Sequence, residues 1–309
     1  MQQMAAAQFQ RYGGPEVLEL TTVPRPSAGS GEVLVKVEAA AVNHHDAVVR
    51  SGTLKIVTGR RFPLGVGLDF AGTDLSTGTP VWGMVSPKSG HVTGSAAEYV
   101  VVPADRVARM PAALTWTDAA ALVTSGTTAL TALRDVTRVR PGERVLIRGA
   151  AGTVGMVAVQ LAAALGAHVA ALAGAKDLDF VRSLGAHEVI DYRTVTSVDL
   201  EPSDVIVDTT GTDLLAYRRR LKRGGRMVTI NFGSAKAMTA IAASTVFGEQ
   251  RVRTFSSYPD TRLLDDLAGH VATGSVWPTV DTIFPLHRIA DAHRALTEPG
   301  HRGKLVLVP

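Results

Sequence analysis

One long apolar stretch constrains the fold of this chain more than any other feature. It reads VLIRGAAGTVGMVAVQLAAALGAHVAAL and runs from Val145 to Leu172. The part after its glycines is nearly uncharged and about long enough to cross a membrane. However, Gln160, Gly166 and His168 interrupt it, so strand-sized and helix-sized pieces explain the pattern better than one long helix. We therefore expect no membrane span.

Three glycines mark a turn inside this stretch. Gly149, Gly152 and Gly155 follow the strand-like VLI with the spacing GxxGxxG, and a helix is expected from about Thr153. Glycine permits a tight turn and lets backbone N–H groups approach a pyrophosphate, while the helix N-terminus offers donors and a positive dipole end. A second strand follows after LGAH, which is the context that such a motif requires. The pattern predicts that Gly152, Thr153, Val154 and Gly155 bind the phosphates of a dinucleotide.

Short apolar runs and helical patterns continue to alternate beyond this stretch. The runs HVAALAG, HEVIDY, DVIVDTTG and GRMVTINFG are separated by helical patterns, one of which is expected to end in RRRLKRGG. Such alternation predicts a parallel sheet covered on both faces, and right-handed crossovers make it doubly wound. We place this Rossmann domain at residues 123–257. The fold class predicted is α/β.

The two ends of the chain have a different pattern. Residues 1–122 alternate apolar and polar side chains between turns rich in Gly, Pro and Ser, as in an antiparallel β domain. Residues 258–309 follow the order strand, helix, strand. We expect this tail to complete the first domain.

The end of the second Rossmann strand bears on the choice of cofactor. An NAD site usually places Asp or Glu there to bind the ribose hydroxyls. Here residues 172–174 are Leu, Ala and Gly, Lys176 follows, and Tyr192 closes the next strand. A lysine can pair with a 2′-phosphate that an acid would repel, so the sequence favours NADP(H) over NAD(H). The alternative is that Lys176 is only a solvated residue at the start of a helix.

Charge and cysteine content exclude several kinds of site. The chain has no cysteine, which removes thiolate metal sites and cysteine nucleophiles and fits a reducing compartment. The N-terminus lacks the pattern of a secretory signal, so we expect a cytoplasmic protein. The net charge of +4 suits an anionic cofactor.

The densest basic run is YRRRLKRGGR, from Tyr217 to Arg226. It is compatible with an RNA or phosphate patch. The competing interpretation is a solvated helix face whose last turn favours cations. Because no aromatic platform is interleaved with the arginines, we favour the solvated face and do not expect nucleic-acid binding.

Eight motifs in order along nearly the whole chain carry a family resemblance. They are YGGPEVLEL, AVNHHDAVVRSG, GLDFAG, AAEYVVVPADRVARMP, AAALVTSGTTALTAL, RGAAGTVG, LGAHEVIDY and GKLVLVP. With them the chain resembles the zinc-independent medium-chain dehydrogenase/reductases, in the branch of quinone oxidoreductases and enone reductases. The resemblance implies a GroES-like antiparallel β domain beside the Rossmann domain, and no metal. It also implies reduction, with NADPH, of a quinone or of the C=C bond of an α,β-unsaturated carbonyl.

Two other functions stay open within this resemblance. One is an enoyl reductase of a biosynthetic pathway, and the other is a non-catalytic NADPH- or RNA-binding protein. Relatives are often homodimers, and RVRTFSSY, from Arg251 to Tyr258, is a candidate edge strand for pairing with a second subunit.

The resemblance also implies site residues. Asn43 is expected near the nicotinamide and substrate, with His44 as a donor or proton source, whereas the alternatives are a turn asparagine and an exposed loop histidine. Asp46 is expected to cap the following helix. Further cofactor contacts are expected at the domain entrance and at the carboxyl ends of two strands. They are Thr127, Thr209, Thr210, Asn231, Phe232 and Gly233, for which ordinary strand-end turns are the alternative.

Overall fold

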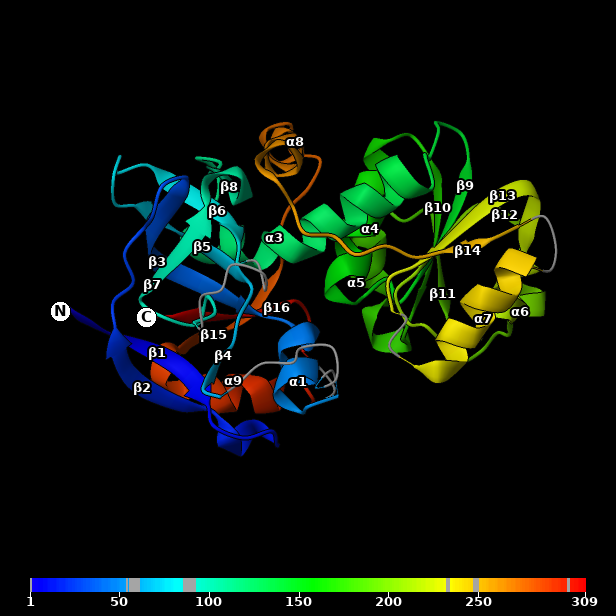
Figure 1. Ribbon diagram of the computed structural model, residues 1–309. Helices are drawn as coiled ribbons and strands as arrows, with labels where there is room; N and C mark the ends of the chain where they lie inside the picture. Colours follow the sequence, from blue (N-terminus) through cyan, green and yellow to red (C-terminus); the bar gives the residue numbers. More distant parts are fainter. Residues whose placement is uncertain are drawn as a thin grey trace. The chain divides into compact units, whose positions relative to one another are not determined.

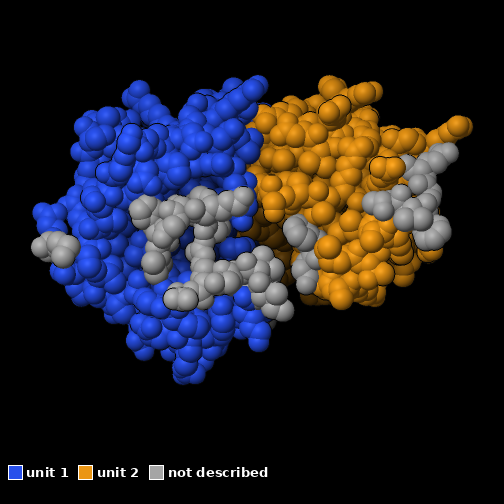
Figure 2. All heavy atoms as spheres, in the orientation of Figure 1, with its two compact units in different colours: residues 1–124, 258–273, 278–309 blue, residues 125–257, 274–277 orange. Residues whose placement is uncertain are grey.

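The chain divides into two compact units. The computed structural model describes residues 2–53, 55, 62–85, 93–231, 234–246, 250–298 and 301–309. Unit 1 comprises residues 1–124, 258–273 and 278–309, and unit 2 comprises residues 125–257 and 274–277 (Figure 2). Unit 2 therefore starts two residues after the predicted boundary and also takes a short piece of the tail. This piece joins unit 2 because Gln160 binds the backbone of Trp277, accepting its N–H at 2.8 Å and donating to its carbonyl at 3.1 Å.

Unit 1 is built on two sheets whose strand pairs are antiparallel, except for the parallel pair of β15 and β16. The larger sheet has the order β15-β16-β3-β5-β6-β8, with β7 also paired to β3. Its strands are β3 (Glu32–Val42), β5 (Asp69–Asp74), β6 (Pro80–Met84), β7 (Tyr99–Pro103), β8 (Val107–Arg109), β15 (Val280–Pro285) and β16 (Lys304–Val308). The smaller sheet consists of β1 (Gln3–Phe9), β2 (Glu19–Pro24) and β4 (Leu64–Gly65). The helices of unit 1 are α1 (His44–Arg50), α8 (Thr261–Ala272) and α9 (Ile289–Ala295). Helix α3 (Trp116–Leu130) contains the boundary between the two units.

The C-terminal strand β16 positions one end of unit 1. β16 pairs with β3 so that Leu305 lies opposite Val42, and both side chains are buried in one core with Phe9. This register brings Lys304 next to Asn43, which directly follows β3. Residues far apart in the sequence therefore meet at the start of α1.

Unit 2 is a doubly wound parallel sheet. Its strand order is β11-β10-β9-β12-β13-β14, and every neighbouring pair is parallel. The strands are β9 (Arg144–Arg148), β10 (His168–Ala173), β11 (Glu188–Asp191), β12 (Ser203–Asp208), β13 (Leu221–Thr229) and β14 (Val252–Arg253). The helices are α4 (Thr153–Ala164), α5 (Leu178–Ser183), α6 (Leu214–Arg218) and α7 (Ala235–Val246). α4 and α5 cover one face of the sheet, and α6 and α7 lie on the other (Figure 1).

The apolar runs of the sequence become strands that are buried on both faces. In β9, Val145, Leu146 and Ile147 are at most 2% exposed. The chain order reverses between β9 and β12, which is where such sheets bind ligands. Together with the largely antiparallel sheets of unit 1, this arrangement confirms the predicted α/β fold class. Within the described ranges, no helix is long and apolar enough to cross a membrane.

The arginine run differs from its prediction. Helix α6 ends at Arg218, and the second half of the run lies in β13. The helix prediction for RRRLKRGG was wrong because the segment has a strand partner elsewhere in the chain. Leu221 pairs with Ser203 and Arg226 pairs with Val205, so the residues between them bulge out of the sheet.

Candidate functional site

The glycine turn after β9 is shaped by two close contacts. Gly149 has a φ of +70°, and a Cβ there would lie 2.3 Å from Thr209 Oγ1. A Cβ on Gly155 would lie 2.1 Å from the carbonyl oxygen of Gly149. Gly152 is exposed, and a Cβ on it would meet nothing closer than 3.3 Å. Gly149 and Gly155 are therefore required for packing, while Gly152 leaves the turn open to a ligand.

Helix α4 begins at Thr153, as predicted, with Gly152 as its N-cap. The first intrahelical bond runs from the Met156 N–H to the Gly152 carbonyl at 2.8 Å. The N–H groups of Thr153, Val154 and Gly155 precede it and have no partner within the helix. No acidic residue occupies the first turn, so these donors and the positive end of the helix dipole are suited to a phosphate.

A buried ion pair holds the neighbouring turn after β12. Asp208 is fully buried and accepts from Arg148 Nη1 at 2.5 Å, from the Thr229 hydroxyl at 2.7 Å and from the Thr210 hydroxyl at 2.8 Å. Arg148 also stacks on Tyr217, with its Cζ 3.5 Å from the ring centroid. An ion pair thus joins the carboxyl ends of β9 and β12.

Several of the predicted cofactor residues lie at these joined strand ends. The Thr209 hydroxyl donates to the carbonyl of Arg148 at 2.8 Å, and the Asn231 amide donates to the carbonyl of Thr210 at 3.2 Å. The structure therefore brings Thr209, Thr210 and Asn231 together beside the glycine turn. Thr127 is fully buried in α3. The predicted contacts Phe232 and Gly233 lie outside the described residues.

The carboxyl end of β10 gathers polar side chains from two strand ends. Lys176 is exposed in a short 3-10 turn after β10, and Tyr192, 51% exposed, follows β11. A Cβ on Gly174 would lie 3.7 Å from both the Tyr192 ring and the Arg193 guanidinium. The Arg193 guanidinium in turn lies 5.3 Å from the centroid of the Tyr192 ring. Sequence reasoning missed Arg193, although it follows Tyr192 directly.

A second polar cluster lies in unit 1 at the start of α1. The Asn43 N–H donates to Asp46 Oδ2 at 2.8 Å, and the two residues form a capping box. The N-cap is therefore Asn43 and not the predicted Asp46, which is the third residue of the helix and accepts the N–H of the cap residue. The Asn43 side chain is 5% exposed, its Oδ1 accepts from Lys304 Nζ, and its Nδ2 donates to Asp69 Oδ2 at 3.2 Å. Both ends of the amide are therefore engaged inside the protein.

Asp69 is the centre of this cluster. The Thr124 hydroxyl donates to Asp69 Oδ1 at 2.5 Å and the Thr124 N–H donates to Oδ2 at 3.2 Å. Lys304 Nζ lies 4.0 Å from the same carboxylate. Lys304 and Asp69 are at most 5% exposed, so this is a buried ion pair that needs its hydrogen bonds. The sequence signal for it was a charged residue at the edge of two apolar strands, and sequence reasoning did not use it.

Burial shifts the pKa values of these groups toward neutrality. Burial, together with the negative charge of Asp69, raises the pKa of Asp46 from 3.8 to about 7, although the hydrogen bond from the Asn43 N–H lowers it. Burial also raises the pKa of Asp69, which the charge of Lys304 opposes. The pKa of Lys304 is lowered by burial, against the charges of Asp69 and Asp46. The cluster can therefore bind or release a proton near neutral pH.

His44 is the first residue of α1 and is exposed. Desolvation lowers its pKa, and the positive charges of Lys304 and His301 lower it further. The imidazole is therefore neutral at pH 7 and can donate one hydrogen bond. In the part of the chain that the structure describes, no group of three or more His, Cys, Asp or Glu side chains could hold a metal ion.

Comparison with known proteins matches both units. Residues 29–112 match a family described as alcohol dehydrogenase GroES-like domain, and residues 184–307 match one described as zinc-binding dehydrogenase. A quinone-oxidoreductase homolog from spinach chloroplasts is 30% identical over 324 residues, which covers 99% of this chain and 98% of the relative.

Solved structures agree with these matches. The quinone oxidoreductase from Coxiella burnetii superposes with a TM-score of 0.89 at 29% identity, covering all of both chains. A mycobacterial protein complexed with NADPH has a TM-score of 0.82 at 25% identity, covering 99% of this chain and all of the other. The family resemblance of the sequence motifs is thus confirmed. The chain belongs to the quinone-oxidoreductase-like branch of the medium-chain dehydrogenase/reductases.

Proposed function

We propose that this protein is an NADPH-dependent, zinc-independent oxidoreductase that transfers hydride to a quinone or to the C=C bond of an α,β-unsaturated carbonyl. The side chains near the carboxyl end of β10 favour NADPH over NADH. Lys176 and Arg193 supply positive charge there, Tyr192 supplies a hydroxyl, and residues 172–174 carry no acid. Charge-assisted hydrogen bonds from these groups suit a 2′-phosphate. The names of the spinach and Coxiella relatives and the NADPH in the mycobacterial structure support the proposal.

The glycine turn fits the rest of the cofactor. Gly152 leaves space that a side chain would fill, and the N–H groups of Thr153, Val154 and Gly155 would bind the pyrophosphate. The bound nicotinamide supplies the hydride. Nearer the nicotinamide we assign contacts to Thr127, Thr209, Thr210, Asn231, Phe232 and Gly233.

His44 and Asn43 receive different roles. As a neutral imidazole, His44 would donate a hydrogen bond or a proton to the substrate oxygen on which negative charge develops. Asn43 is the N-cap of the helix that begins with His44, and its amide is held by Lys304 and Asp69. We therefore assign Asn43 the positioning of His44.

The test is NADPH oxidation, followed at the cofactor's absorption band, with a panel of quinones, enones and enoyl thioesters. The enoyl thioesters separate a biosynthetic enoyl reductase from a quinone or enone reductase. We expect NADPH to be preferred over NADH and at least one class to be reduced. Absence of NADPH oxidation across the whole panel would refute the activity.

Two substitutions test the assignment of the 2′-phosphate site. Lys176→Ala and Arg193→Ala should each reduce the ratio of kcat/KM for NADPH to that for NADH by roughly ten- to a hundredfold, because each removes a charge-assisted hydrogen bond. Arg182→Ala is the matched control, since this exposed arginine pairs only with Asp179 among the contacts described. If the ratio changes equally in all three variants, the proposed phosphate site is wrong.

A further inference from the structure

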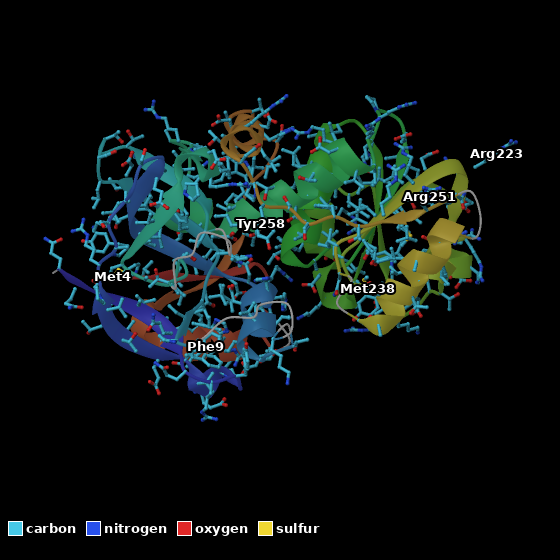
Figure 3. The ribbon with its side chains drawn as sticks, viewed as in Figure 1. Met4, Phe9, Arg223, Met238, Arg251 and Tyr258 are labelled. Atoms are coloured by element: carbon cyan, nitrogen blue, oxygen red, sulfur yellow. The ribbon has the colours of Figure 1, made fainter. Side chains whose placement is uncertain are left out.

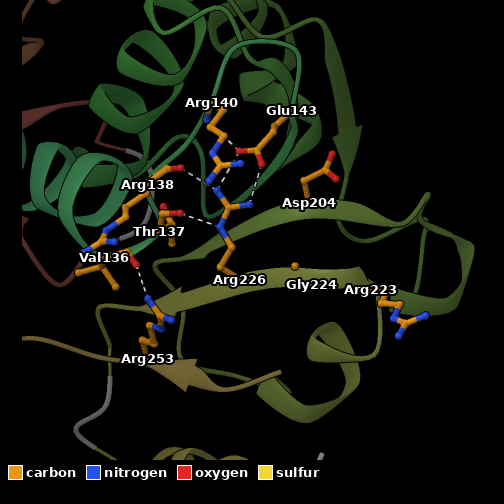
Figure 4. Close-up of a pocket in the computed structure, with 11 residues that line it drawn as sticks. Val136, Thr137, Arg138, Arg140, Glu143, Asp204, Arg223, Gly224, Arg226 and Arg253 are labelled. Carbon is orange, nitrogen blue, oxygen red and sulfur yellow. Dashed lines mark hydrogen bonds and ion pairs between the residues drawn. The ribbon is translucent and has the colours of Figure 1, made fainter. Parts of the chain in front are cut away.

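A pocket of about 350 Å³ lies in unit 2, away from the glycine turn. It is lined by residues 136–138, 140, 143, 204, 223–226 and 253 (Figure 4). Glu143 directly precedes β9 and Asp204 is the second residue of β12, so the pocket lies at the amino ends of these strands. The glycine turn follows the carboxyl end of β9, about 16 Å away for a five-residue strand. We call the pocket at the amino ends of β9 and β12 the arginine pocket.

Its lining is strongly basic. Five arginines line it, namely Arg138, Arg140, Arg223, Arg226 and Arg253, together with two acids. Both acids are already paired. Glu143 binds Arg226 through both oxygens, at 2.7 and 2.9 Å, and Asp204 accepts from Lys222 Nζ at 2.8 Å. Among the described residues, no carboxylate pairs with the side chains of the other four arginines, although the Arg140 N–H donates to Glu143 at 2.8 Å.

The floor of the pocket is held in place by backbone carbonyls. Arg226 Nε donates to the Thr137 carbonyl at 2.7 Å and Nη2 donates to the Arg138 carbonyl at 2.8 Å. Arg253 Nη1 donates to the Val136 carbonyl at 2.7 Å. The hydrogen bonds of Arg226 to Glu143 hold the pKa of this carboxyl below its usual value. The two arginines thus have fixed positions while the charge of Arg253 stays without a carboxylate partner in the described ranges.

The bulge in β13 brings a further arginine to the pocket. Between Leu221 and Arg226 the strand bulges, and Gly224 adopts a φ of +75°, which favours glycine. Arg223 consequently extends outward from the end of this strand (Figure 3). In the close-up, Arg138, Arg140 and Arg253 surround Arg226, and Arg223 lies at the far end of the bulge (Figure 4).

Unpaired like charges around one concavity repel one another, and a bound anion removes that repulsion. Guanidinium groups bind phosphate oxygens with two parallel hydrogen bonds. We infer that the arginine pocket binds a compact polyanion, a small molecule that carries a diphosphate or triphosphate group. Its volume lies in the range of small-molecule sites, and none of its described lining residues is an aromatic side chain on which a nucleic-acid base could stack. Arg223 and Arg226 bring the second half of the arginine run into this pocket.

Calorimetric titration of the full chain with sodium tripolyphosphate at constant ionic strength tests this inference, with saturating NADPH present to fill the cofactor site. The double variant Arg138→Ala/Arg140→Ala should weaken binding at least about tenfold, because two phosphate contacts are lost. Neither side chain contacts another described residue through a hydrogen bond or ion pair, so folding should be retained. Arg251→Ala, which removes an exposed arginine that does not line the pocket, should change binding less than about twofold.

Four results of this titration would overturn the inference, and a fifth comes from a comparison with RNA. They are no binding of tripolyphosphate to the wild-type chain, equal binding by the double variant, an equal loss in Arg251→Ala, or full competition by NADPH. The last would place the anion at the glycine turn. Tighter binding of a single-stranded RNA than of tripolyphosphate at equal phosphate concentration would also overturn it, because it would indicate a nucleic-acid surface instead. Since the titration measures binding and not turnover, its failure is distinguishable from failure of the proposed reductase activity.

Discussion

Replacing Asp46 by asparagine should change how the stability of unit 1 depends on pH. Asp46 is 3% exposed, and burial raises its pKa from 3.8 to about 7. In the unfolded chain the carboxyl keeps its ordinary pKa, so between the two values the folded state binds more protons. The free energy of unfolding of the wild type therefore falls as the pH rises through this range, and the loss is complete above the folded pKa.

The size of this effect follows from the pKa values. A rise from 3.8 to about 7 corresponds to about 4 kcal/mol. An asparagine cannot ionise, yet its side-chain oxygen can still accept the Asn43 N–H that Asp46 Oδ2 accepts at 2.8 Å. At pH 8 the variant should therefore be more stable than the wild type. The gain is up to about 4 kcal/mol, reduced by roughly 1 kcal/mol because asparagine is an imperfect cap. At pH 5 the two proteins should differ much less.

Urea unfolding between pH 5 and 8 measures this difference. Of the three tryptophans, Trp82 and Trp116 belong to unit 1, so in a Trp277→Phe background the fluorescence reports on that unit. Only the backbone of Trp277 bonds to Gln160, and its side chain is 51% exposed, so this background change is mild. Linear extrapolation then gives the free energy of unfolding at each pH.

The control is Asp105→Asn. This side chain is 74% exposed, so its replacement should leave the pH dependence of the wild type intact. If Asp46→Asn and the wild type show parallel curves from pH 5 to 8, Asp46 does not titrate in that range and the account of the buried cluster is wrong.

Three further substitutions test other parts of the structure. Lys304→Met should lower the free energy of unfolding by about 3–5 kcal/mol, because it leaves Asp69 buried without its counter-ion. Adding Asp69→Asn should restore much of this stability. A Lys304→Met variant as stable as the wild type would contradict the ion pair. Gly155→Ala should weaken NADPH binding roughly tenfold or more in a fluorescence titration, because its Cβ would displace the turn. The control Gly269→Ala, whose Cβ would meet nothing within 4 Å, should bind NADPH normally. An equal effect of both substitutions would exclude the steric explanation. His44→Gln should lower kcat while leaving the KM for NADPH unchanged, and an unaltered kcat would remove His44 from the mechanism.

The nucleotide-binding half could be predicted largely from the sequence, because its signals are local. Gly149 is favoured by its φ of +70°, and Gly155 by its close approach to the Gly149 carbonyl within the same turn. The helix starts at Thr153 because the spacing and the N-cap are set by neighbouring residues. The capping box of Asn43 and Asp46 is local in the same way. The homodimer and the cytoplasmic location stay predictions, as do the catalytic assignments.

The features that the sequence did not reveal depend on pairing between distant segments. Lys304 and Asn43 meet across 261 positions, and only the register of β16 on β3 brings them together. The arginine run has helical composition, yet part of it pairs with β12 and bulges toward residues 136–143.

The sequence by itself thus determined the α/β architecture, the glycine turn and the absence of an acid after β10, since periodicity and steric limits act over a few residues. Only the tertiary structure decided which charges are buried together and which arginines share a pocket. Both depend on long-range strand register, because burial and electrostatic neighbours are properties of the assembled sheets and not of any single segment.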